Sequence, residues 1–173
     1  MAKDLEDAVD DIMKEVAQNL VKDLSDKMIE CLKAHIWNDV YIKDHGDPTN
    51  KIYVGGNGSE GSYGLPTFEF MNAFRFDNIE KGLNEISTNL IYDYLGMHKY
   101  NTSYVDEEGN IQTYGVHQTK EGEDLREELF DLLNTDDMFG GKERDKYWDN
   151  FLNDVEANLD IWIEKSLLRQ GLR

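Results

Sequence analysis

The chain has 173 residues, and its 36 acidic against 18 basic residues give a formal net charge of −18. This charge argues against a sequence-independent grip on nucleic acid and against docking on anionic lipid, because both depend on Lys and Arg. Apolar residues make up 39% of the chain, which is enough for the core of one domain spanning residues 1–173. The single cysteine, Cys31, excludes an internal disulfide. No run of about 18 apolar residues occurs, so we expect a soluble protein of a reducing compartment.

The first predicted element is one long amphipathic helix from about Lys3 to Lys43. Its apolar residues recur at spacings of three and four, and no Pro or Gly interrupts them. Forty helical residues would span about 60 Å. So long an apolar stripe is difficult to cover within one small domain. It predicts either a partner subunit as its cover or a break near Ser25 and Asp26.

A Gly-rich inserted loop is predicted at about residues 44–62, with room for one short strand at Ile52–Val54. Its glycines do not form a phosphate-binding loop, because no Lys-Ser or Lys-Thr pair follows them. No strand-to-helix transition frames them either. Long loops of this kind are usually functional, disordered or ordered by a partner.

Two antiparallel β hairpins are predicted next. The first pairs Ala73–Ile79 with a strand over Ile86–Tyr92 through a turn at Lys81-Gly82. The second pairs Tyr100–Val105 with Ile111–Val116 through a polar turn.

The C-terminal third is predicted to be helical. A short helix is expected over Asp124–Asn134, then a loop, then a last helix over Glu143–Gln170 that ends before Gly171. The fold class that follows is α+β, with a long N-terminal helix, antiparallel β hairpins, a short helix and a long C-terminal helix.

No catalytic, cofactor-binding or metal-binding residue is predicted. None of the four histidines pairs with another at i+3 or i+4, and no nucleophile lies in a known turn motif. A lone histidine near carboxylates, such as His117, is most often a hydrogen-bonded surface group. The acidic clusters lack the alternating ligands of a calcium loop. The sequence therefore gives no support to an enzyme.

Residues 63–74 read Tyr-Gly-Leu-Pro-Thr-Phe-Glu-Phe-Met-Asn-Ala-Phe, which resembles a short signature in neck and tail-completion proteins of tailed bacteriophages. In that family the signature follows a long helix and precedes a β hairpin that ends near an aspartate, here Asp93. A His-Gly-like element and an Asp-x-Arg helix start come next, and an aromatic segment precedes the last helix. The chain departs from the pattern by its 44–62 insertion and by lacking the family's Arg-Thr pair.

The resemblance implies a structural virion protein that forms a ring of six or twelve copies. Such a ring joins the phage head to the tail, after assembly in the cytoplasm of the bacterial host. The implied partners are portal or head-completion proteins, adaptor proteins and tail proteins, with genomic DNA passing nearby and no membrane contact. The residues that match the family motifs, and are thus assembly candidates, are Tyr63, Pro66, Thr67, Glu69, Phe70, Asp93, His117, Gly122, Asp124, Arg126 and Trp148.

Other interpretations of the same sequence stay open. Pro66 can simply fix a turn, Asp124 can begin a helix, and Arg126 can pair with nearby acids for about 0–1 kcal/mol. At the level of function, an acidic DNA mimic or inhibitor would place carboxylates on one face to bind a basic partner. An enzyme with an unseen site would instead require a deep pocket.

Overall fold

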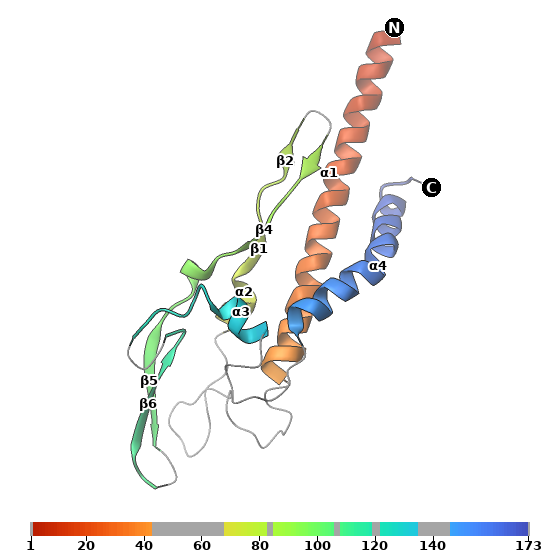
Figure 1. Cartoon of the computed structure of the whole chain (residues 1–173). Coiled ribbons are helices and arrows are strands. Elements are labelled where there is room, and N and C mark those ends of the chain that lie inside the picture. Colours follow the sequence, from red (N-terminus) through yellow and green to blue (C-terminus); the bar gives the residue numbers. More distant parts are fainter. Residues whose placement is uncertain are drawn as a thin grey trace.

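The computed structural model describes residues 2–42, 68–82, 85–105, 108–118, 122–134 and 146–172. The predicted loop at 44–62 and the motif residues Tyr63, Pro66 and Thr67 lie outside these ranges. Within them the fold is α+β, as predicted: a long N-terminal helix, small antiparallel hairpins, a short helix and a long C-terminal helix (Figure 1).

Helix α1 (Ala2–His35) confirms the predicted long helix, and it continues into a π-helical segment, η1 (Ile36–Ile42). No break occurs near Ser25, whose hydroxyl donates to the carbonyl of Val21 within the helix at 2.7 Å. Helix α4 (Tyr147–Arg169) packs alongside α1, while the N-terminal turns of α1 extend beyond it (Figure 1). The apolar stripe of α1 is therefore covered over only part of its length.

The first predicted hairpin is divided into two small sheets. Strand β1 (Phe74–Phe76) pairs with β4 (Leu90–Tyr92), and β2 (Glu80–Lys81) pairs with β3 (Ile86–Ser87). The prediction of a single strand over Ile86–Tyr92 is therefore wrong.

The interruption has a local cause in the side chain of Thr88. Its hydroxyl donates to the carbonyl of Asp77 at 2.8 Å, taking the place of a backbone ladder bond between the two sheets. Lys81, which was predicted to lie in the turn, belongs to β2, and the Gly82 N–H closes the hairpin by donating to the carbonyl of Glu85 at 2.8 Å.

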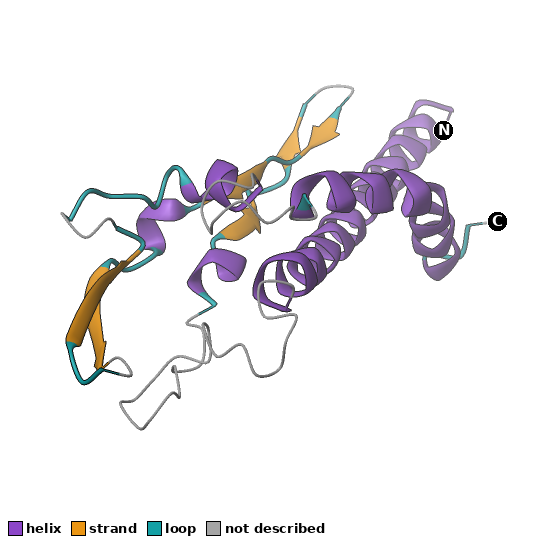
Figure 2. Cartoon of the chain, turned by 60° about the horizontal axis from the view of Figure 1, so that its bottom comes forward, coloured by secondary structure: helices purple, strands orange, loops and turns teal. Residues whose placement is uncertain are grey.

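The second predicted hairpin is confirmed. Strands β5 (Tyr100–Val105) and β6 (Ile111–Val116) pair antiparallel from Tyr100↔Val116 to Val105↔Ile111. This hairpin projects from the side of the molecule away from α1 and α4 (Figures 1 and 2).

Three short helical elements connect these parts: α2 (Glu69–Asn72), the 3₁₀ turn η4 (Tyr94–Gly96) and α3 (Leu129–Asn134). The helix predicted from Asp124 begins only at Leu129. Asp124 instead forms a bridge with Gln118, and its carboxylate accepts the Arg126 N–H at 3.1 Å. This local bond favours a turn over a helix.

The core lies where the C-terminal part of α1 meets α2, β1, α3 and the start of α4. Its centre is aromatic: Phe74 stacks on Tyr92 at 5.0 Å, and Phe70 meets the edge of Tyr147 at 5.9 Å. Such pairs contribute about 0.5–1.5 kcal/mol beyond their buried area. The buried apolar residues are Leu32, Ile36, Val40, Phe70, Ala73, Phe74, Met97, Leu129, Leu133, Tyr147 and Phe151.

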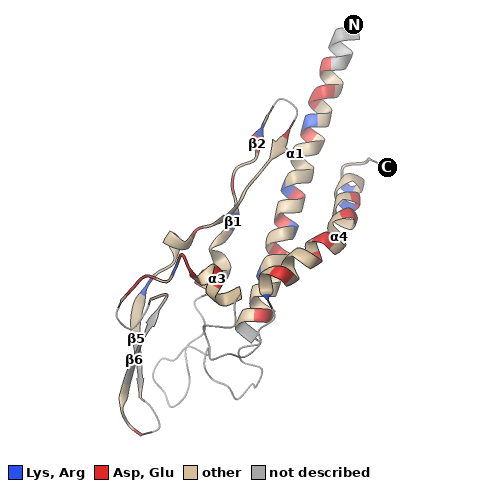
Figure 3. Cartoon of the chain, viewed as in Figure 1, with Lys and Arg blue, Asp and Glu red and all other residues tan. Residues whose placement is uncertain are grey.

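Away from this core, α1 and α4 are joined by polar contacts. The fully buried Ser166 hydroxyl donates to the Asp23 carboxylate at 2.6 Å, and Arg169 pairs with the same carboxylate at 3.0 Å. Acidic residues are distributed along the length of both helices (Figure 3). None of the described helices combines the length and the apolar character needed to cross a membrane.

Candidate functional site

Four of the motif residues, namely Glu69, His117, Asp124 and Arg126, converge on the short segment Leu95–Lys99. We call these residues and the segment the root network, because β5 begins directly after Lys99 and β6 ends directly before His117. They come from α2, from the end of β6 and from the turn before α3.

Glu69 forms one half of the root network. Its carboxylate accepts the His98 backbone N–H at 3.1 Å and lies 2.8 Å from the His98 ring Nδ1. The same carboxylate lies 3.3 Å from Nδ1 of His117. Glu69 therefore holds both ends of the β5–β6 hairpin against α2.

His117 is fixed by its backbone as well as by its ring. Its φ of 56° is in the left-handed region, which among the described non-glycine residues is shared only with Phe68, directly before Glu69. The ring Nδ1–H donates to the His98 carbonyl at 2.6 Å, and the His117 carbonyl accepts the Leu125 N–H at 3.0 Å. These bonds maintain the left-handed backbone of His117.

Arg126 forms the other half. Its Nη1 donates to the carbonyls of Met97 at 2.7 Å and Leu95 at 3.2 Å. Its Nε and Nη2 contact the two carboxylate oxygens of Asp124 at 2.9 and 2.8 Å, a bidentate pair. Lys99 approaches the same carboxylate at 3.5 Å.

The two charged side chains in this half of the root network, Asp124 and Arg126, shift each other's pKa. Hydrogen bonds from Arg126 hold the pKa of the Asp124 carboxyl well below its usual range. The same pair raises the pKa of Arg126. The root network thus consists of mutually paired ions and hydrogen bonds, which suits it to hold a projecting hairpin in a set direction.

The remaining motif residues have separate structural roles. Asp93 donates its N–H to the Ala73 carbonyl at 2.8 Å and pairs weakly with the exposed Arg75 at 3.6 Å. Gly122 has a φ of 90°, a conformation that favours glycine. Phe70 belongs to the core, and Trp148 meets the edge of Phe130 at 4.9 Å.

Trp148 also borders an open hollow of about 380 Å³. Its lining is mainly aromatic and apolar, with Glu127 and Asp131 at its edge. The hollow is largely open to solvent.

Comparisons with known protein families, curated proteins and solved structures find no match. The geometry of this chain and its resemblance in sequence are therefore the grounds for a functional proposal.

Two projecting elements carry exposed apolar side chains at their ends. On the N-terminal part of α1, Val9, Ile12 and Met13 are 50%, 59% and 58% exposed. At the tip of the β5–β6 hairpin, the paired residues Val105 and Ile111 are 65% and 75% exposed. The spacing of apolar residues predicts the stripe on α1, whereas no sequence pattern predicted the exposed apolar pair at the hairpin tip.

Proposed function

We propose that this chain is a ring-forming structural subunit of a tailed-phage neck, which joins the head to the tail around the DNA exit path. The observation that carries the proposal is the pair of exposed apolar surfaces at the ends of α1 and of the β5–β6 hairpin. Contiguous apolar surface on a soluble chain marks a contact with another protein.

The position of these surfaces favours repeated contacts between copies. They lie on different elements, and the two elements project from different sides of the core (Figures 1 and 2). A subunit in a ring needs two different surfaces, one for each neighbour, and such heterologous contacts close when each repeats the same rotation. The α1 stripe and the hairpin tip meet this requirement.

The root network supports the same proposal in a second way. A ring closes only if each subunit presents its arms at a fixed angle. Glu69 and Arg126 fasten both ends of the hairpin to the core, through His98 and His117 on one side and Met97 on the other. In this proposal the motif residues set the geometry of assembly rather than catalysing a reaction.

The acidic charge has a role in this proposal if carboxylates face the channel, where they would repel the DNA backbone and keep the genome from adhering. Asp and Glu lie along the length of both long helices (Figure 3). A map of intact particles tests this directly. A channel lined mainly by Lys, Arg or apolar side chains would rule out this role for the charge while leaving the ring itself intact.

The experiment that tests assembly is mass photometry and negative-stain microscopy of the purified full chain, alone and with particles that lack a neck. Rings, or incorporation in multiples of six, are the expected result. A chain that stays monomeric in both settings refutes the proposal. Tight binding of that monomer to a basic DNA-binding protein would instead favour the DNA-mimic alternative.

A further inference from the structure

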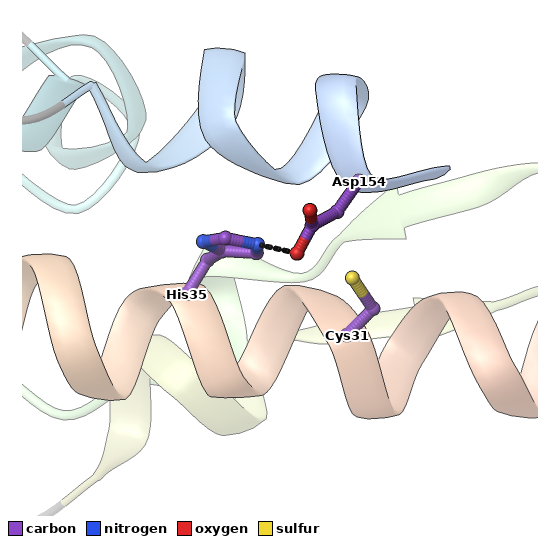
Figure 4. Close-up of side chains that lie close together, drawn as sticks. All are labelled: Cys31, His35 and Asp154. Atoms are coloured by element: carbon purple, nitrogen blue, oxygen red, sulfur yellow. Dashed lines mark hydrogen bonds and ion pairs between the residues drawn. The ribbon is translucent and has the colours of Figure 1, made fainter. Parts of the chain in front are cut away.

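Three side chains with metal-binding chemistry meet between α1 and α4, away from the root network. Cys31 and His35 are one helical turn apart on α1, and Asp154 reaches them from α4 (Figure 4). Their ligand atoms, a sulfur, a ring nitrogen and a carboxylate oxygen, all lie within 4.8 Å of one another.

The histidine of this group is already oriented toward the other two. Its Nδ1 lies 3.0 Å from the Asp39 carboxylate, which is buried and also accepts a hydrogen bond from the Asn150 amide at 3.1 Å. Its Nε2 faces the Asp154 carboxylate at 2.8 Å. Because Asp39 holds one side of the ring, the other nitrogen is directed into the space between the helices.

We propose that Cys31, His35 and Asp154 bind a zinc ion, with water as the fourth ligand. Thiolate, imidazole and carboxylate are the ligands that zinc takes in proteins, and a thiolate selects zinc over magnesium or calcium. Asp39 takes the place of the carboxylate that commonly orients a metal-binding histidine through its second nitrogen.

The distances are compatible with this ion. Zinc bonds of about 2.0–2.3 Å in a tetrahedron place neighbouring ligand atoms about 3.3–3.8 Å apart. Separations of up to 4.8 Å must therefore close by no more than about 1–1.5 Å, and the His35–Asp154 contact of 2.8 Å must open slightly. Side-chain rotation of the exposed Asp154 can supply most of this movement.

An ordinary ion pair between the two helices accounts for His35 and Asp154 alone. It does not involve the sulfur of Cys31, which lies beside them and packs against the core, and it does not require Asp39 behind the ring. His98 and Glu69 offer the comparison within this chain, since they form a histidine–carboxylate pair at 2.8 Å. Among the described residues, no thiol lies with that pair.

A bound ion would add a cross-link between α1 and α4 beside the His35–Asp154 hydrogen bond. The two helices are far apart in the sequence, since 119 residues separate His35 from Asp154. This site does not depend on the proposed ring, and it can be present or absent whatever the chain assembles with.

The test uses the full chain, reduced and freed of metal with a chelator. Titration with Co²⁺ is expected to produce a thiolate-to-cobalt charge-transfer band in the near ultraviolet, and Zn²⁺ is expected to displace it. Competition with a chromophoric chelator then gives the zinc affinity. We expect Cys31→Ser, His35→Gln and Asp154→Asn each to weaken it by at least about 100-fold, and Asp39→Asn by about 10–100-fold.

His98→Gln is the matched control, because it removes an imidazole from a carboxylate pair that has no thiol nearby. Its zinc affinity is expected to equal that of the wild type. Circular dichroism of each variant without metal shows whether it is folded. A wild-type chain that binds Co²⁺ without a thiolate band overturns the proposal, and so does a folded Cys31→Ser chain with unchanged zinc affinity.

Discussion

Replacing the exposed apolar residues at the end of α1 tests whether this stripe joins copies of the chain. In the variant Val9→Gln, Ile12→Gln, Met13→Gln, the three side chains lost from the surface are each half exposed or slightly more. Glutamine preserves helix propensity. Since these side chains are not part of the core, we expect the free energy of unfolding to change by no more than about 0.5 kcal/mol per site.

The effect on association follows from the same exposed fractions. Fully burying one such side chain is worth about 1.5–3 kcal/mol. Burying the exposed part of all three would then contribute about 2.5–5 kcal/mol to one contact. At about 1.4 kcal/mol for each factor of ten, the variant is expected to associate about 60- to 4,000-fold more weakly.

Sedimentation velocity over a concentration series measures this loss, and urea denaturation of the same samples measures stability. The control variant is Asp11→Gln, Lys14→Gln, which changes exposed charged residues on the other side of the same turns without altering the net charge. If both variants associate like the wild type, the stripe is not an interface and the reasoning fails.

Three further predictions concern the core, the root network and the cysteine. Phe151→Ala removes a ring that is 1% exposed and is expected to lower the free energy of unfolding in urea by about 3–5 kcal/mol; a loss below 1 kcal/mol would contradict the described core. Arg126 lowers the pKa of Asp124 in the folded chain. The ionised Asp124 carboxylate therefore contributes its full stabilisation above the usual carboxyl range, and this stabilisation is lost as the pH falls through the lower pKa of the folded state. The free energy of unfolding that Asp124→Asn loses relative to the wild type is therefore expected to shrink from pH 5 toward strongly acidic pH. A loss that stays constant with pH would refute the pairing. Burial, and secondarily Asp154, raises the pKa of the Cys31 thiol, so iodoacetamide is expected to alkylate it more slowly in the metal-free folded chain than in urea. Asp154→Asn is expected to restore only part of that rate, and full restoration would contradict burial as the larger cause.

The helices were the most predictable part of this fold. The spacing of apolar residues and the lack of Pro and Gly identified α1, and Gly171 marked the end of α4 with its φ of 81°. The π-helical winding of Ile36–Ile42 left no signal in the spacing. It accompanies the burial of Ile36, Asp39 and Val40 against other elements, so it depends on tertiary contacts.

The strands and the short helix show where local patterns are insufficient. Alternation over Ile86–Tyr92 is compatible with one strand, and the side-chain bond from Thr88 to Asp77 divides it. Asp124 is a good residue for a helix start, but its bonds to Arg126 and Gln118 delay the helix to Leu129. In both cases a side chain competes with the backbone ladder or helix.

The candidate sites depend on contacts between distant segments, which spacing cannot reveal. The resemblance singled out Glu69, His117 and Arg126, but nothing in the sequence indicated that they meet around His98. The sequence also contains the Cys-x-x-x-His spacing of Cys31 and His35, which are one helical turn apart. That spacing was visible, whereas its third member, Asp154, is on another helix.

The distribution of acids along α1 and α4 has a consequence for any assembly built from copies of this chain. Each added copy brings a net charge of −18 close to the same charge on its neighbour, so cations must gather as the contacts form. Salt shortens the range of this repulsion from about 30 Å at 0.01 M to about 8 Å at physiological ionic strength. Self-association of this protein is therefore expected to strengthen with added salt, the reverse of what salt does to proteins that grip DNA.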